Sequence, residues 1–245
     1  MSGSRILGLR GMLETLRISV PTVLDGLFGR VTVERCNRRL LDWSRRLVEQ
    51  GEIDLEVRGA DAVDWGHAYV IMSNHQSLYD IPLLYQALRG TVRMVTKQEL
   101  FKIPIWGRAM RDAGFVPIDR KQRHKAIESI SEAGRAIQRG VNIWIAPEGT
   151  RSPDDNLLPF KKGGFILARD LGVPILPVCI DGSRHSLPLG SLSPVVGQHV
   201  TVTIGAPIPV AGKSVDELSA ELRAWLEQTL GRPAATGSPS QRAAR

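Results

Sequence analysis

From residue 52 onward, short apolar runs alternate with helical patterns, and this alternation restricts the possible folds more than any other feature of the chain. Helical patterns span Tyr79–Leu88, Lys125–Gln138 and Gly164–Leu171. The apolar runs that predict strands are Ile53–Val57, Ala68–Met72, Val92–Thr96, Phe115–Ile118, Asn142–Ala146, Ile175–Ile180 and Val200–Ile204. This alternation predicts an α/β domain with a largely parallel or mixed sheet flanked by helices. In such a sheet, functional groups gather at the carboxyl ends of the strands.

The first 48 residues have a different pattern, which is typical of amphipathic helices. One apolar stripe recurs at spacings of three and four and consists of Ile6, Leu9, Leu13, Leu16, Val20, Leu24, Leu27 and Val31. Pro21 interrupts the stripe and fits the first turn of a second helix. Arg5, Arg10 and Arg17 flank the stripe, as in helices that lie on anionic lipid. Packing on the chain's own domain or on a partner subunit explains the stripe at least as well.

A last amphipathic helix is expected from Ser214, a plausible N-cap with Glu217 three residues on, to Leu230. The residues beyond it are small and polar and predict a disordered tail. We therefore expect an N-terminal helical segment over residues 1–48, a main domain over residues 49–230 and a tail over residues 231–245.

Cysteine content and hydropathy limit the cellular setting. Cys36 and Cys179 are the only cysteines, and their positions suggest neither a disulfide framework nor a metal site. A reducing cytoplasm is the simplest setting for such a chain. No stretch approaches 18 uninterrupted apolar residues, so no transmembrane helix is expected, and the first ten residues do not resemble a secretory signal.

The formal net charge of +7 is concentrated in one part of the chain. Residues 86–125 hold ten Lys or Arg against three acidic residues, whereas residues 51–85 hold one Arg against six. Such a local excess suits a polyanion, namely a nucleic acid, an anionic membrane surface or a phosphorylated substrate. A solvated basic face that binds nothing is the alternative.

A histidine follows the expected strand Ala68–Met72, and Asp80 lies five residues after it. At this spacing the Asp80 carboxylate can accept a hydrogen bond from one ring nitrogen of His75, which leaves the other nitrogen free to act as a base. On its own, a histidine near an aspartate is more often a structural hydrogen bond. The pair therefore needs support from other parts of the chain.

Two further strand ends carry dense polar clusters. The first is Gly114–Arg120, in which Arg120 can bind a phosphate through two N–H groups, although a surface ion pair with Asp119 is an equally simple interpretation. The second is Glu148–Arg151, which closes an apolar run and contains a glycine that permits a tight turn. In a parallel sheet these strand ends converge near His75.

A fourth segment, Val173–Val178, is an apolar strand that contains Pro174 and Pro177. Each proline removes one hydrogen-bond donor from the strand, so the segment is expected at a sheet edge or at a strand start. It can line an apolar pocket, but a role in the core is the more common one for such a strand.

Taken in order and with their spacing, the four segments resemble the four conserved blocks of the glycerolipid acyltransferase family, which includes bacterial 1-acylglycerol-3-phosphate acyltransferases. The resemblance covers roughly residues 50–210. It implies that His75 is the general base for the acceptor hydroxyl and that Asp80 orients and charge-balances it. The positions that it implies for binding the acceptor are Arg120, Glu148, Gly149, Thr150 and Arg151. The supporting positions that it implies are Asn74, Ser77, Phe115, Asp119 and Pro174.

The resemblance also implies an activity and its partners. An acyl group would pass from acyl-CoA or acyl carrier protein to the free hydroxyl of 1-acylglycerol 3-phosphate, without a metal or another cofactor. Another lysolipid or glycerol 3-phosphate is the alternative acceptor. Because such acceptors reside in a bilayer, residues 1–48 are then expected to hold the protein peripherally on anionic lipid at the cytoplasmic face of the cell membrane.

Three rival functions are weaker. A serine hydrolase would share the histidine and aspartate, but the chain contains no Gly-x-Ser-x-Gly motif. A Walker motif ending at Gly212 would need a glycine where Pro207 stands. A non-catalytic module that binds membranes or nucleic acid would keep its function after the loss of His75, whereas an acyltransferase would lose turnover, and we expect no nucleic-acid partner.

Overall fold

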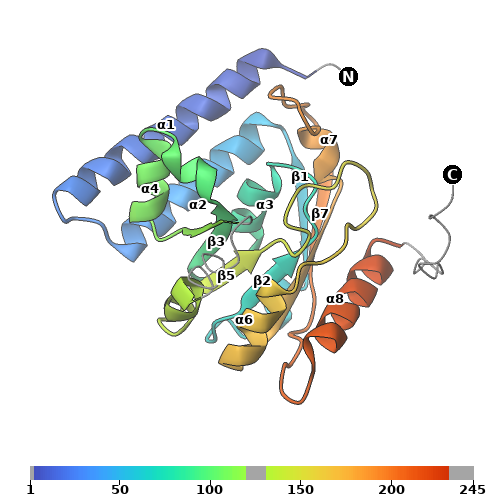
Figure 1. The fold of residues 1–245 in the computed structure, drawn as a ribbon. Helices are drawn as coiled ribbons and strands as arrows, with labels where there is room; N and C mark the ends of the chain where they lie inside the picture. The colour runs from blue at the N-terminus through green and yellow to red at the C-terminus, as the bar shows by residue number, and fades with distance from the viewer. Residues whose placement is uncertain (1–2, 120–130, 232–245) are drawn as a thin grey trace, which may run out of the picture.

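The computed structural model describes residues 3–119 and 131–231. Its centre is a seven-stranded sheet in the order β1-β7-β6-β2-β5-β3-β4, in which β6 and β7 are antiparallel and all other neighbours are parallel. The strands are β1 (Asp54–Arg58), β2 (Val70–Ser73), β3 (Val92–Lys97), β4 (Val116–Ile118), β5 (Asn142–Ile145), β6 (Ile175–Asp181) and β7 (His199–Ile204). Each predicted strand is therefore present, and the predicted α/β class is confirmed (Figure 1).

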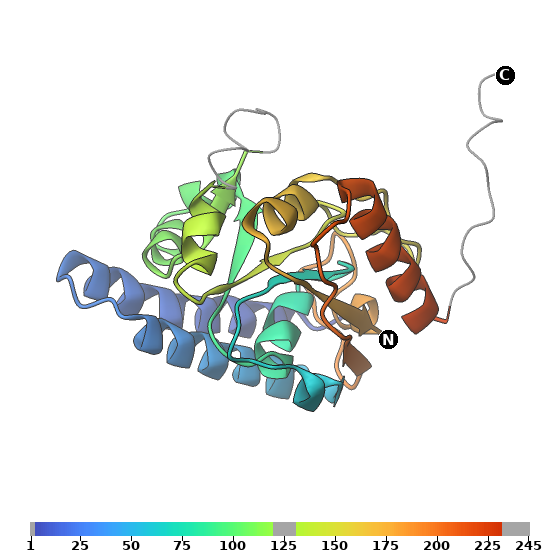
Figure 2. The same cartoon turned by 90° about the horizontal axis from the view of Figure 1, so that it is seen from below.

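Helices cover both faces of this sheet. The helical elements are α1 (Arg5–Leu27), α2 (Val33–Gln50), η1 (Ala60–Ala62), α3 (Asp80–Ala87), η2 (Gln98–Lys102), α4 (Trp106–Asp112), α6 (Gly163–Leu171), α7 (Ser183–Ser186) and α8 (Val215–Thr229). Residues 131–137 are also helical, and the rest of the helix predicted over Lys125–Gln138 lies outside the described residues. Figure 2 shows α1 and α2 on one side of the sheet and α6 and α8 on the other.

The central strands are apolar on both faces because helices bury both of them. Val70 and Met72 of β2 pack with Phe165 of α6 and Leu222 of α8, whereas Ile71 packs with the cluster that contains α2 and α3. Alternate residues of one strand thus belong to two cores, as the period of two requires. This arrangement fixes the register of β2 and, with it, the position of the loop that follows.

Of the two places expected for the proline-containing strand, the sheet edge is wrong, whereas Pro174 does stand at the strand start, directly before Ile175. β6 lies between β2 and β7, and Pro177 is inside it. The Pro177 carbonyl accepts a hydrogen bond from Gly205 N at 2.9 Å, just beyond the end of β7, so the position of its missing N–H faces a region where the neighbouring ladder has ended. A central strand tolerates this proline because the missing donor lies at the end of the β6–β7 ladder, where only one terminal bond depends on it.

The expected start of a second helix at Pro21 is also wrong, because α1 continues through that residue to Leu27. The second helix begins at Val33 instead, with Thr32 as its N-cap. A proline inside a helix removes one backbone hydrogen bond. α1 is nevertheless supported along its length by packing on α2 and α4 (Figure 1).

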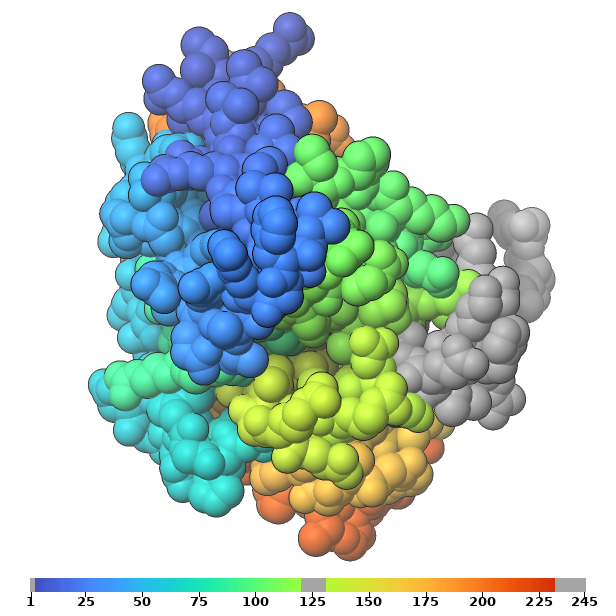
Figure 3. All heavy atoms as spheres, turned by 90° about the vertical axis from the view of Figure 1, so that its left-hand side faces the viewer, coloured from blue at the N-terminus to red at the C-terminus, as the bar shows by residue number. Residues whose placement is uncertain are grey.

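The two N-terminal helices differ in their burial. Leu40 and Leu47 of α2 belong to the core on the sheet, so α2 is a structural part of the main domain. α1 lies further out and exposes most of its large apolar side chains (Figure 3). In residues 3–119 and 131–231, no helix combines the length and the hydropathy needed to cross a membrane.

Candidate functional site

The loop between β2 and α3 carries His75 and is fixed to the neighbouring strand β6. The Asn74 side chain donates from Nδ2 to the Ile180 carbonyl at 2.7 Å and accepts from Ile180 N at 2.8 Å. The Asn74 side chain thus makes the two hydrogen bonds to the Ile180 backbone that a strand residue would make, at the point where β2 ends. Ser77 has a structural part in the same loop, since its Oγ donates to the Leu187 carbonyl and accepts from Tyr79 N. The loop is therefore rigidly placed before any substrate binds.

His75 and Asp80 form the pair that the sequence predicts. His75 Nδ1 lies 2.7 Å from Asp80 Oδ2, and the same oxygen accepts from Gln76 N at 2.8 Å and from Ser77 N at 3.0 Å. Asp80 is fully buried at the start of α3, where the helix dipole favours a negative charge. Because the carboxylate accepts at Nδ1, a neutral imidazole carries its proton there and presents Nε2 as the basic nitrogen.

Trp144 of β5 contacts the imidazole of His75 and fixes the orientation of that ring. The two rings meet edge to face, with centroids 5.6 Å apart and an interplanar angle of 88°. Trp144 Nε1 in turn donates to Ser73 Oγ at 2.9 Å, which fixes the indole. Trp144 is not among the site residues predicted from the sequence, although an aromatic residue near the end of the adjacent strand was the available signal.

Glu148 supports His75 from behind. Its Oε1 accepts from His75 N at 2.9 Å and its Oε2 from Leu158 N at 2.8 Å. Burial raises the pKa of Glu148, and the hydrogen bonds from the Leu158 and His75 backbones offset part of that rise. Both carboxylate oxygens are thus used by backbone N–H groups. The structure therefore places Glu148 as a positioning residue for the His75 loop, and not as a residue free to contact an acceptor directly.

A cavity of about 810 Å³ opens beside His75 and extends under α1 and α2. Thr150 and Arg151 line it near the histidine, and Arg151 Nη1 is buried without a hydrogen-bond partner among the described residues. The deeper wall is apolar and includes Leu40, Trp43 and Met110. Among the described residues, the charged groups that line this cavity besides His75 are all cationic: Arg39, Lys97, Arg151 and Lys161.

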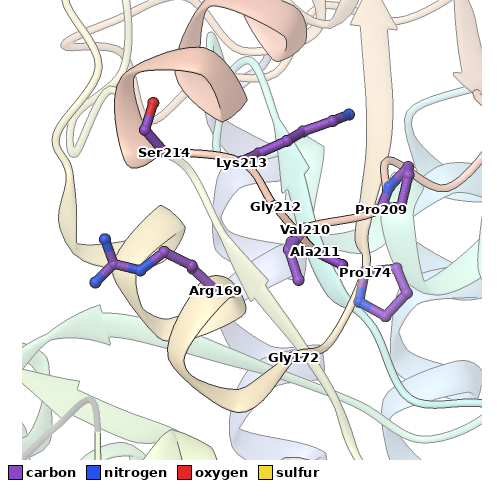
Figure 4. Close-up of a pocket in the computed structure, with 9 residues that line it drawn as sticks. All are labelled: Arg169, Gly172, Pro174, Pro209, Val210, Ala211, Gly212, Lys213 and Ser214. Atoms are coloured by element: carbon purple, nitrogen blue, oxygen red, sulfur yellow. The ribbon is translucent and has the colours of Figure 1, made fainter.

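The remaining candidates divide into three groups. Phe115 is buried and lines the same cavity. Asp119 stands at the end of the described segment, and Arg120 lies outside the described residues. The structure does not bring Pro174 to the site: Pro174 precedes β6, at the amino end of the strands, and lines a separate pocket there with Arg169 (Figure 4).

No group of three or more His, Cys, Asp or Glu in the described part of the chain is arranged to hold a metal ion. The site offers a histidine paired with a buried aspartate beside a cavity whose charged lining is cationic in the described residues. A hydroxyl placed at Nε2 would be activated for attack on an electrophile held in the same cavity.

Replacing Glu148 by glutamine is expected to lower the free energy of unfolding by about 1–3 kcal/mol, because an amide can accept only one of the two backbone N–H groups. Burial raises the pKa of the Glu148 carboxyl, so the protonated carboxyl contributes to the free energy of unfolding at low pH. In the wild type this contribution should be lost as the pH rises through the raised pKa. The glutamine variant should show no such loss. Urea unfolding at several pH values measures both effects. Glu49→Gln, which removes an exposed ion pair with Arg45, is the control. Equal free energies of unfolding in the two variants would contradict the proposed part of Glu148 in fixing the His75 loop.

A histidine held by a buried aspartate, at the carboxyl end of a parallel strand, is an arrangement that suits an enzyme that transfers a group to a hydroxyl. The family model described as Acyltransferase matches residues 54–181. The 1-acyl-sn-glycerol-3-phosphate acyltransferase of Salmonella typhimurium is 37% identical over 175 residues, which are 70% of this chain and 70% of that protein. This chain belongs to the acyltransferase family.

Other relatives extend over different fractions of their length. The chloroplastic 1-acyl-sn-glycerol-3-phosphate acyltransferase BAT2 of Brassica napus is 33% identical over 161 residues, which cover 66% of this chain and 46% of that protein. This chain thus spans about half the length of that relative. Among solved structures, the 1-acyl-sn-glycerophosphate acyltransferase PlsC from Thermotoga maritima matches with a TM-score of 0.72 and 28% identity, over 92% of this chain and 96% of the other.

Proposed function

We propose that this chain transfers a fatty acyl group from an acyl thioester to the free hydroxyl of 1-acylglycerol 3-phosphate, which gives phosphatidic acid. The observation that carries the proposal is the juxtaposition of the His75–Asp80 pair with a cavity whose charged lining is cationic in the described residues and whose deeper wall is apolar. Phosphate complements the cations, and fatty acyl chains complement the apolar wall.

In the proposed reaction, His75 Nε2 takes the proton of the acceptor hydroxyl while the oxygen attacks the thioester carbonyl carbon. The buried Asp80 carboxylate stabilises the imidazolium that forms. The C–S bond then breaks as the tetrahedral oxyanion collapses, and the imidazolium returns the proton to the leaving thiolate. The products are the ester and a free thiol, so no oxidant or other co-reactant is needed. The thiol belongs to coenzyme A or to acyl carrier protein.

Residues that we expect to bind the acceptor phosphate are Arg151, which has a buried unpartnered Nη1, and Arg120. Thr150 lines the cavity beside Arg151. Guanidinium groups suit a phosphate because they contact it through two N–H groups at once. Gly149 keeps the turn between Glu148 and Thr150 in a left-handed conformation, with a φ of 70°.

A lysophospholipid acceptor also requires access to a bilayer. We infer that α1 supplies it, since its apolar stripe is exposed and is flanked by the exposed arginines Arg5, Arg10 and Arg17. The protein would then bind peripherally to anionic lipid on the cytoplasmic face of the cell membrane.

An acceptor panel in mixed micelles, with a radiolabelled acyl donor, tests the proposal. We expect 1-acylglycerol 3-phosphate to be acylated with the highest kcat/KM, ahead of glycerol 3-phosphate, lysophosphatidylcholine and 1-acylglycerol. A preference for another lysolipid would assign the enzyme to that acceptor. Absence of transfer to every acceptor, with retained binding to nucleic acid or vesicles, would favour a non-catalytic binding module.

A further inference from the structure

Lys161 stands in the loop between β5 and α6 and was not selected from the sequence. Its backbone N donates to the Pro147 carbonyl at 2.8 Å, which brings it alongside the turn that carries Glu148 and Arg151. Its side chain lies directly on Gly149. The point where a Cβ of residue 149 would stand is 2.9 Å from Lys161 Cε and 3.1 Å from its Nζ. The Lys161 side chain therefore lies over the turn at Gly149, whose φ of 70° favours glycine.

The Lys161 ammonium has no ion-pair or hydrogen-bond partner among the described residues, although the neighbouring lysine has one. Lys162 Nζ lies 2.7 Å from Asp216 of α8 and is thus neutralised on the outer side of the loop. Lys161 instead lines the cavity that contains His75 and Arg151. The loop therefore directs two adjacent lysines to different partners, one to a carboxylate and one to the cavity.

Two cations that line one cavity without a counter-ion among the described residues both favour an anion placed between them. Arg151 contributes a buried Nη1 without a partner, and Lys161 contributes a compact ammonium. No acidic side chain in the described part of the chain lines this cavity, so the charges are not balanced from within it. The Lys161 ammonium lies close to Gly149, in the same turn as Glu148, which accepts a hydrogen bond from His75 N.

We propose that Lys161 binds the phosphate of the acceptor together with Arg151, with the lysine side chain lying over the turn at Gly149. This inference rests on the proposed function, because it takes the acceptor to be a phosphorylated glycerolipid. Lys161 acts as a point charge, which tolerates small shifts of the phosphate, whereas Arg151 fixes its orientation.

The test compares Lys161→Met with Lys162→Met in the full chain. Methionine keeps the length of the side chain and removes the charge. We expect Lys161→Met to raise the KM for 1-acylglycerol 3-phosphate by about tenfold or more, because a charge-assisted hydrogen bond to phosphate is lost. The KM for acyl-CoA should stay within about twofold, and Lys162→Met should resemble the wild type. Lys161→Arg should recover most of the acceptor affinity.

Equal acceptor KM values in the two methionine variants would overturn the inference. So would a higher KM for acyl-CoA alone, which would assign the lysine to the phosphates of the donor.

Calorimetric titration with a short-chain, soluble 1-acylglycerol 3-phosphate separates this inference from the proposed function. Binding that is lost in Lys161→Met and kept in Lys162→Met supports the lysine site even if no acyl transfer to this acceptor is found. Transfer by the wild type together with unchanged binding in Lys161→Met would leave the function standing and reject the site.

Discussion

Replacing His75 by alanine is expected to lower kcat for acyl transfer by about 10²–10⁴-fold, the usual contribution of a positioned general base. The acceptor hydroxyl is a weak nucleophile, and Nε2 of His75 is the basic nitrogen that the Asp80 contact leaves free at the cavity. The KM for the acceptor should change little, because the cations that we expect to bind its phosphate remain. Steady-state kinetics with a radiolabelled donor measures the effect.

The alanine variant is expected to remain folded. Asp80 keeps its hydrogen bonds from Gln76 N and Ser77 N, and the Asn74 side chain still joins the loop to β6. His67→Ala is a matched control, since that histidine also pairs with an aspartate, at 2.9 Å, but is 71% exposed at the surface. Retention of wild-type turnover in a folded His75→Ala protein, as shown by circular dichroism, would refute the assignment of the base.

The parts of the site that the sequence predicts are those that depend on local spacing. His75 and Asp80 are five residues apart and are joined by a strand end and the first turn of a helix, so their contact follows once β2 and α3 are assigned. The convergence of this loop with Glu148 follows from the parallel sheet, in which β2 and β5 are neighbours. Periodicity alone was enough for these elements.

Roles that depend on the direction of a side chain were not predictable in the same way. A carboxylate at position 148 can face a ligand or the backbone, and only the structure shows that His75 N and Leu158 N occupy it. Lys161 and Lys162 are adjacent and chemically identical, yet one lines the cavity and the other pairs with Asp216. Sequence patterns carry no information on such a division when it depends on a distant helix.

The expectation of a helix start at Pro21 and that of a sheet edge for the strand containing Pro177 failed for a common reason. Each assumed that a missing N–H donor must lie at an end or an edge. Pro177 instead faces the end of β7, and Pro21 lies in a helix supported by α2 and α4. In both places the tertiary context decides whether the donor is needed. The position of Pro174 away from His75 follows from the same strand, because the residue before β6 belongs to the amino end of the sheet.

α1 is the element whose exposure is least explained by folding alone. Its inner face carries small residues, and the hydroxyls of Thr15, Ser19 and Thr22 bond to carbonyls of the preceding turn. Its outer face carries large apolar residues that contact little of the protein. A soluble domain rarely exposes a continuous apolar stripe of this kind without a partner. A bilayer fits the stripe and its flanking arginines better than a polar protein surface does.

Substituting Ile6, Leu9 and Leu13 together by serine is expected to weaken binding to anionic vesicles by about 10²–10³-fold. These side chains are 67%, 55% and 56% exposed and do not line the cavity, so each loses roughly 1 kcal/mol or more of burial in lipid while the site stays intact. Sedimentation with phosphatidylglycerol-containing liposomes measures the binding. Val57→Ser, which removes an exposed apolar group from the edge strand β1, is the control. Unchanged vesicle binding in the triple variant would show that α1 does not anchor the enzyme, because another part of the protein surface would then have to bind the bilayer.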